Sequence, residues 1–217
     1  MPDSRAVLVG TSTYVGGLPQ LDQAAANLTD LHDVLLDVVD TGGLHLFTDP
    51  VAARLVLDRL DGCASSPADL LLFYYAGHGL RDQDDRLCLA LTGSVDTPRD
   101  ARRTSLPLDS VLEIMKHAKA RHRVVVLDCC YSGLALDSPA AADLHLLTAT
   151  NRTTKAAYRA GARNTEFTGE LVRVLDGPGP LDLGGIYREL DRALTARGRP
   201  RPRQRCVDHS ADLVLRP

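Results

Sequence analysis

The feature that most constrains the fold of this chain is a series of short apolar segments that alternate with longer segments of helical periodicity. Residues 69–75 and 123–128 are almost uniformly apolar, which is typical of strands that are buried on both faces of a sheet. Residues 21–38 and 108–118 instead repeat apolar side chains at the spacing of a helix turn, which predicts amphipathic helices. The alternation predicts an α/β fold in which a parallel sheet has helices on both faces.

Further segments extend this pattern along the chain. Strands are also predicted at 6–9, 45–48, 87–91, 144–148 and 212–215, and helices at 52–60, 167–175 and 186–194. The Arg-rich stretch 197–205 contains interleaved prolines and is predicted to be a solvated loop. No internal repeat or domain boundary is evident, so residues 1–217 are expected to form a single domain.

The composition argues against several classes of function. The net charge is −3 and aromatic residues make up 4% of the chain, without tryptophan, so neither a nucleic-acid partner nor an anionic membrane partner is expected. No apolar run approaches the roughly 18 residues of a membrane span, and the first residues lack the plan of a secretory signal. The five cysteines have neither disulfide-scaffold nor zinc-site spacing. We therefore expect a cytoplasmic protein with reduced thiols.

Two strand ends carry the residues that are best suited to chemistry. The predicted strand 69–75 runs into His78, which has a glycine on each side, and the strand 123–128 runs into Cys129 and Cys130. In doubly wound sheets, ligands bind outside the carboxyl ends of the strands. If these two strands are neighbours, the imidazole and a thiol converge on one crevice.

A thiol beside an imidazole is suited to nucleophilic catalysis. A free thiol has a pKa of about 8.5, and an adjacent imidazole raises the fraction of thiolate, which is the nucleophile. His78 would take this proton and return it to a leaving amine. The backbone N–H groups of Gly79 and Cys130 could form an oxyanion hole. These residues therefore predict acyl-transfer chemistry.

The same residues carry a resemblance to a known family. The sequence Tyr-Ala-Gly-His-Gly at 75–79 is followed by Asp-Cys-Cys-Tyr-Ser-Gly at 128–133. With this spacing the chain resembles the caspase-like cysteine peptidases, especially metacaspases and bacterial caspase-like proteins, from Ala6 to about Leu215. The resemblance implies the caspase-like fold, a mostly parallel six-stranded sheet with helices on both faces, and the activity of a cysteine endopeptidase.

The resemblance also implies roles for individual residues. Cys130 corresponds to the nucleophile, His78 to the general base, and Asp128 to the acid of the pocket for the side chain that precedes the cut. Asn27 and Ala76 are expected in the same pocket. A carboxylate there pairs with Arg, or with Lys as a point charge, so we expect cleavage after basic residues.

Two positions depart from the metacaspase pattern. Tyr131 follows the nucleophile where metacaspases usually have His, and Asn27 is neutral where their first helix usually supplies a second pocket acid. Asp30 lies one helix turn further on. These departures bear on the strength of the basic preference and leave the catalytic pair unaffected.

No cofactor is expected. Some metacaspases require calcium, and a calcium dependence stays open, but Asp82, Asp84 and Asp85 lack the ligand spacing of an EF-hand, so we predict no metal site. The expected partners are a protein or peptide substrate and a regulatory domain or activator protein. Bacterial members of the family are commonly one module of a larger protein that acts in defence or regulated cell death.

Two alternative functions remain at this point. A caspase-like module can serve as a non-catalytic interaction scaffold, although both Cys130 and His78 are present here. A flavodoxin-like nucleotide or phosphate binder fits the predicted sheet, but no glycine-rich phosphate-binding motif occurs.

Maturation by self-cleavage has few candidate positions. The segment Ser132–Asp143 contains neither Lys nor Arg, so we expect no cut there after a basic residue. The candidate positions are the Arg-rich stretch 197–205 and, after the predicted strand 144–148, Arg152, Lys155 and Arg159.

Overall fold

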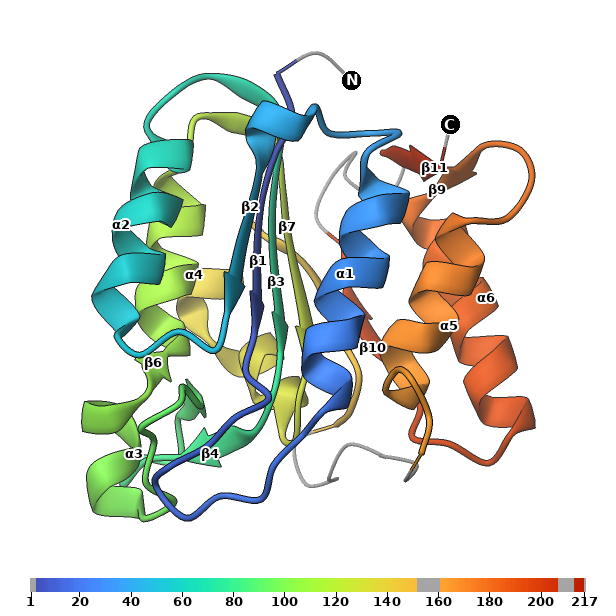
Figure 1. The fold of residues 1–217 in the computed structure, drawn as a ribbon. Coiled ribbons are helices and arrows are strands. Elements are labelled where there is room, and N and C mark those ends of the chain that lie inside the picture. The colour runs from blue at the N-terminus through green and yellow to red at the C-terminus, as the bar shows by residue number, and fades with distance from the viewer. Residues whose placement is uncertain (1–2, 152–160, 207–212, 217) are drawn as a thin grey trace.

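A six-stranded sheet forms the centre of the computed structural model, which describes residues 3–151, 161–206 and 213–216 (Figure 1). Its strands are β1 (Arg5–Gly10), β2 (Leu44–Thr48), β3 (Ala68–Ala76), β7 (Ala120–Asp128), β8 (His145–Thr148) and β10 (Arg203–Arg205). They lie in the order β10-β8-β7-β3-β1-β2. All neighbouring pairs are parallel except β10 with β8, which is antiparallel. The prediction of a mostly parallel α/β sheet is confirmed.

Helices cover both faces of this sheet (Figure 1). One face packs against α1 (Gln23–Leu35), α5 (Glu166–Leu175) and α6 (Leu183–Ala196), and the other against α2 (Ala53–Ala64) and α4 (Leu108–His117). All five predicted helices are therefore confirmed, with changes of a few residues at their ends. None of the helices within the described residues is long and apolar enough to cross a membrane.

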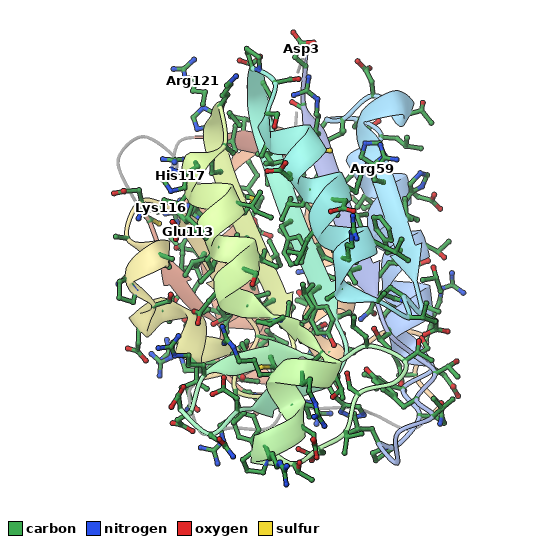
Figure 2. All side chains as sticks on the ribbon, turned by 90° about the vertical axis from the view of Figure 1, so that its left-hand side faces the viewer. Asp3, Arg59, Glu113, Lys116, His117 and Arg121 are labelled. Atoms are coloured by element: carbon green, nitrogen blue, oxygen red, sulfur yellow. The ribbon has the colours of Figure 1, made fainter. Side chains whose placement is uncertain are left out.

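The uniformly apolar strands supply both layers of the core. In β1, Ala6 and Leu8 pack with α1, whereas Val7 and Val9 pack with α2 and α4, and all of them are fully buried. A strand that contributes to both layers needs an apolar residue at nearly every position, because successive side chains enter opposite layers. Charged residues such as Arg59 of α2 lie on the outer surface of the helices (Figure 2).

A small antiparallel sheet lies at the carboxyl end of the central strands (Figure 1). Its strands are β4 (Gly79–Arg81), β5 (Leu87–Leu89) and β6 (Leu106–Pro107), with β5 in the middle. The turn between β4 and β5 is stabilised by Asp82, whose Oδ1 accepts the backbone N–H groups of Asp84 and Arg86 at 3.0 and 2.9 Å. The predicted short strand at 87–91 is therefore one arm of a hairpin that begins directly after His78.

A short helix, α3 (Pro98–Thr104), is present that periodicity does not predict. Its seven residues are too few to show a repeating apolar face. The sequence does contain a start signal, because Thr97 caps the helix by accepting the N–H of Asp100 at 3.1 Å and a proline occupies the first turn.

The position predicted for the last strand of the sheet is wrong. Residues 203–205, expected in a solvated loop, form β10 and pair with β8. The residues expected to form that strand instead overlap β11 (Val214–Arg216), which pairs with β9 (Leu181–Asp182) outside the central sheet. Arginines are tolerated in β10 because it is a short edge strand, where one side of the backbone is unpaired and charged side chains are common.

The rest of the Arg-rich stretch packs against the neighbouring helices through ion pairs. These pairs are Arg197–Glu170, Arg199–Glu166 and Arg201–Asp191, with N···O distances of 2.9, 2.9 and 2.6 Å. Glu170 and Glu166 belong to α5 and Asp191 to α6. The stretch is therefore fixed to the protein by its charges and does not extend freely into solvent.

The pairing of β8 with β10 contains a buried histidine. His145 is 1% exposed, and its Nε2 lies 3.0 Å from the side-chain amide nitrogen of Gln204 in β10. Since the amide nitrogen can only donate, His145 accepts this bond in its neutral form. Burial lowers the pKa of His145 from 6.5 to about 4.

We expect the free energy of unfolding to decrease as the pH falls from 6.5 to about 4. In this interval His145 takes up a proton in the unfolded chain but not in the folded chain, so acid favours unfolding by up to about 3 kcal/mol. Urea unfolding at several pH values would measure this loss in the wild type and in His145→Gln, which keeps a hydrogen-bond acceptor for Gln204. The wild type should lose more stability than the variant below pH 6.5, and parallel curves would contradict the prediction.

Candidate functional site

The two strand ends singled out by the sequence are adjacent in the sheet. β3 pairs with β7 in parallel, and the last paired residues are Ala76 and Asp128. The N–H of Gly77 donates to the carbonyl oxygen of Asp128 at 3.3 Å, which continues the pairing just beyond β3. His78 and Cys130 therefore leave the sheet at the same point, each two residues beyond the last pair.

His78 and Cys130 line one cleft at this end of the sheet, with a volume of about 690 Å³. The walls of the cleft also include Pro19 from the loop between β1 and α1, residues 81–83 from the β4–β5 hairpin, and Tyr131. This volume lies within the range of typical ligand sites. The cleft can therefore accept part of a peptide chain next to the imidazole and the thiol.

A backbone carbonyl fixes the tautomer of the His78 ring. The Nε2 atom of His78 lies 2.9 Å from the carbonyl oxygen of Pro19. Since a carbonyl only accepts, Nε2 carries the proton of the neutral ring and Nδ1 has the lone pair. Nδ1 is therefore the ring nitrogen of His78 that can accept a proton.

The two positions beside His78 have no room for a side chain, so both require glycine. A Cβ atom at Gly79 would lie 2.0 Å from the carbonyl oxygen of Cys130, and a Cβ atom at Gly77 would lie 2.3 Å from the hydroxyl oxygen of Tyr75. Both distances are far shorter than van der Waals contact. The Gly-His-Gly sequence thus allows the start of β4 to pack directly against the backbone of Cys130.

Thr150, at the end of β8, holds the loop that carries Cys130. Its Oγ1 donates to the carbonyl oxygen of Cys129 at 3.2 Å and accepts the N–H of Ser132 at 3.3 Å. Between them, Tyr131 has a left-handed φ of 60°, which turns the chain from β7 into a 3-10 helix. Sequence reasoning misses Thr150 and Ser132, because their contacts with this loop leave no periodic or motif signal.

The other cysteines lie outside the cleft. Cys63, Cys88 and Cys129 are buried, and Cys206 is exposed. Burial raises the pKa of the Cys88 thiol to about 12 and raises that of Cys129 well above its usual range. Among the cysteines of the chain, Cys130 is therefore the thiol that a molecule in the cleft would meet.

Asp128 belongs to a buried hydrogen-bond network next to the site. Its side chain is 1% exposed, and its Oδ2 accepts the hydroxyl groups of Thr165 and Thr168 at 2.5 Å each. Its Oδ1 has no hydrogen-bond partner among the residues that the structure describes. Burial raises the pKa of Asp128 above its ordinary 3.8, and the hydrogen bonds from the two threonines oppose this shift.

The structure brings Asn27 into the same network. Its Nδ2 donates to Oγ1 of Thr165 at 3.0 Å, and its Oδ1 accepts the N–H of Thr165 at 3.1 Å. Ala76 is fully buried and pairs with Asp128 in the sheet. The three expected pocket residues therefore group together, but none of them lines the cleft described above.

Thr165 and Thr168 are members of this network that sequence reasoning misses. Thr165 caps α5 by accepting the N–H of Thr168 at 3.2 Å. The hydroxyl of Thr168 also lies 2.6 Å from that of Tyr74 in β3. A threonine directly before a predicted helix is a recognisable cap signal, but nothing in the sequence connects this cap with Asp128.

The acidic residues near the site make local contacts. Asp82 pairs with Arg102 at 3.4 Å in addition to its bonds in the hairpin turn. Asp30 pairs with Arg163, whose guanidinium lowers the pKa of the Asp30 carboxyl. No group of three or more His, Cys, Asp or Glu in the described part of the chain could hold a metal ion. The candidate self-cleavage positions 152, 155 and 159 lie outside the described residues.

Comparisons with known proteins agree with this fold. The family described as "Caspase domain" matches residues 3–213. Among solved structures, the crystal structure of caspase-1 from Spodoptera frugiperda is similar, with a TM-score of 0.70 and 15% sequence identity, and the match covers 94% of this chain and 86% of that chain. At this identity the structural similarity establishes the fold alone. No curated protein matches the chain.

We expect the substitution Gly79→Ala to destabilise the protein by about 1–3 kcal/mol, because the added Cβ atom meets backbone atoms that can move only together with β4 or Cys130. Gly62→Ala is the matched control. A Cβ atom at Gly62 in α2 meets no atom within 4 Å, so this change should stabilise the helix by roughly 0.5–1 kcal/mol. Urea unfolding would measure both effects, and a Gly79→Ala variant as stable as the wild type would refute the steric argument.

Proposed function

The chain belongs to the caspase domain family, and from this premise we propose that it is a cysteine endopeptidase in which Cys130 is the nucleophile and His78 is the general base. One observation above all supports this proposal: His78 and Cys130, each two residues beyond the end of neighbouring central strands, line the same cleft. The protonation of His78 supports it too, since Nδ1 has a lone pair that can accept a proton from a thiol.

The proposed reaction proceeds through an acyl-enzyme. His78 takes the proton of the Cys130 thiol, and the thiolate attacks the carbonyl carbon of the peptide bond, whose π electrons move onto oxygen. The N–H groups of Gly79 and Cys130 stabilise that oxygen. The intermediate then breaks its C–N bond, and His78 gives its proton to the leaving amine. Water, deprotonated by His78, attacks the thioester, and the acid and the free thiol are released.

We propose that residues 1–217 act as one peptidase domain on protein or peptide substrates without a cofactor. A regulatory domain or activator protein controls the activity, and the biological setting is bacterial defence or regulated cell death in the cytoplasm. These points follow from the family resemblance of the Gly-His-Gly and Asp-Cys-Cys segments.

We also propose that cleavage follows Arg or Lys, and that Asp128 selects them. Support comes from the state of this carboxylate: Oδ2 is held by two threonine hydroxyls, while Oδ1 has no partner in the described part of the chain. Asp128 does not line the cleft, so the proposal requires that a substrate side chain reaches it from there, and its guanidinium or ammonium group would then give Oδ1 a charge-assisted hydrogen bond. A buried carboxylate with a raised pKa gains more from such a partner than an exposed one does.

We expect the protein to cleave fluorogenic peptides after Arg or Lys and not after Asp. Replacement of either reacting group, in Cys130→Ala or His78→Ala, should lower kcat by about 10³-fold or more, because each step of the reaction uses both groups. The controls are Cys206→Ala and His117→Ala, which remove an exposed thiol and an exposed imidazole outside the cleft.

The outcomes separate the competing functions. Cleavage after Asp would keep the mechanism and refute the basic preference. If the wild type cleaves nothing and its Cys130 reacts with an acyloxymethyl ketone no faster than a free thiol, the chain is a non-catalytic scaffold. Fast labelling without cleavage indicates an enzyme that awaits its activator.

We expect Asp128→Asn to lower kcat/KM for Arg substrates by about 10- to 100-fold, the loss of one charge-assisted contact, and at the same time to raise the melting temperature at neutral pH. The raised pKa means that ionisation of Asp128 penalises the folded state, so wild-type stability falls as the pH rises from 3.8 towards the raised value. The variant should lack this fall.

The matched control is Asp30→Asn. The Asp30 carboxyl has a lowered pKa because it pairs with Arg163, so its removal should leave the melting temperature unchanged or slightly lower. Peptide assays and thermal unfolding across pH would measure both variants. Equal Arg cleavage by Asp128→Asn and the wild type would show that this carboxylate does not select the substrate.

A further inference from the structure

The loop between β1 and α1 contacts His78 at more than one point. Besides the carbonyl of Pro19 on Nε2, the side chain of Tyr14 meets both the backbone and the ring of His78. Tyr14 and His78 are 64 residues apart in the sequence. This loop is therefore a candidate support for the imidazole.

The hydroxyl of Tyr14 has two fixed hydrogen-bond roles. Its oxygen accepts the N–H of His78 at 3.0 Å, and its proton is donated to the carbonyl of Thr11 at 2.8 Å. Tyr14 is 4% exposed, and burial raises its pKa well above the usual range, so the hydroxyl keeps its proton. The backbone of His78 is therefore attached to the end of β1 through one buried hydroxyl.

The ring of Tyr14 also packs against the imidazole. The two ring centroids are 4.8 Å apart and the rings are tilted by 48°. This contact lies within the range of favourable aromatic pairs. Together with the bond from Nε2 to Pro19, it restricts rotation of the His78 side chain.

Gln20 braces Tyr14 from within the loop. Its side-chain Oε1 accepts the N–H of Tyr14 at 2.9 Å, and its Nε2 donates to the carbonyl oxygen of Tyr14 at 2.8 Å. Because Gln20 directly follows Pro19, the same two bonds also fix the carbonyl that holds Nε2 of His78. Outside the loop, Asp49 accepts the N–H groups of Ser12 and Thr13 at 2.6 and 2.9 Å.

We propose that Tyr14, braced by Gln20, is a positioning residue that holds the imidazole of His78 in the orientation needed to accept the Cys130 proton. The inference rests on the proposed peptidase function and adds a residue to it. The reason is geometric: a displacement of about 1 Å at a reacting group can cost 10²-fold in rate. Tyr14 does not line the cleft and acts only through His78.

The test is the pH dependence with which iodoacetamide alkylates Cys130. Under the proposed function His78 accepts the Cys130 proton, so we expect fast alkylation of the wild type at pH 7. In Tyr14→Phe the ring remains but the hydroxyl is lost, so the midpoint of the profile should move up by about one pH unit towards the free-thiol value and alkylation at pH 7 should fall about tenfold. With an Arg peptide, kcat should fall while KM stays within about twofold. Asp82, Asp85 and Asp96, which also line the cleft, are unchanged in the variant.

Two further variants serve as a control and as an independent test of the role of Tyr14. Tyr187→Phe in α6 removes a tyrosine hydroxyl far from the cleft in the fold and should retain the wild-type profile. Gln20→Ala changes an exposed side chain, so the protein should fold, and it should shift the midpoint in the same direction as Tyr14→Phe.

The results distinguish this inference from the proposed function. A wild-type midpoint in folded Tyr14→Phe, or in Gln20→Ala if the first variant does not fold, overturns the positioning role and leaves the peptidase intact. A wild-type Cys130 that reacts like a free thiol overturns the proposed function and this inference with it. A shifted midpoint that is absent in Tyr187→Phe supports the positioning role.

Discussion

The parallel pairing of β3 with β7 is the interaction on which the rest of the structure depends. Because its register ends at Ala76 and Asp128, the residues that follow the two strands leave the sheet together and the cleft forms where they leave. A shift of this register by one residue would exchange the two core layers for one strand, and both layers are apolar and closely packed. The burial that stabilises the sheet therefore also determines the relative positions of His78 and Cys130.

Polar contacts between distant segments complete the site around this apolar centre. Thr150 holds the loop after β7, and Thr165 connects Asp128 with α1 through Asn27. The Asp128 network keeps a carboxylate in the interior at a cost in stability, since its raised pKa shows that burial disfavours the charged form. Proteins commonly accept such a cost where a buried polar group serves a function. Because Asp128 belongs to the network and Cys130 lines the cleft, the end of β7 joins the buried network to the cleft.

Apolar patterning was sufficient to predict most of the fold, and motif spacing to predict that His78 and Cys130 line the same cleft. The core strands and all long helices follow from periodicity because their burial demands apolar residues at set intervals. The strand β10 could not be predicted in this way, because an edge strand with arginine at alternate positions contains no run of apolar residues. The contacts of Thr150, Thr165 and Tyr14 could not be predicted from the sequence either, because a hydrogen bond between residues far apart in the chain depends on the completed fold. The two glycines beside His78 marked this segment in the sequence as unusual. The reason for them, which is the close approach of Gly77 to Tyr75 and of Gly79 to Cys130, is seen only in the folded structure.

The long sequence separation of the contacts in the site has a consequence for synthesis of the protein. His78 depends on Tyr14, and the loop of Cys130 depends on Thr150, so the site draws on segments from both halves of the chain. A ribosome-bound chain that ends before residue 150 already contains the thiol and the imidazole but lacks the side chain that supports the loop between Cys129 and Ser132. The cleft that His78 and Cys130 line is therefore completed late in translation, after most of the sheet has emerged. A chain that assembles its site in this order completes the surroundings of Cys130 only after Thr150 has been synthesised.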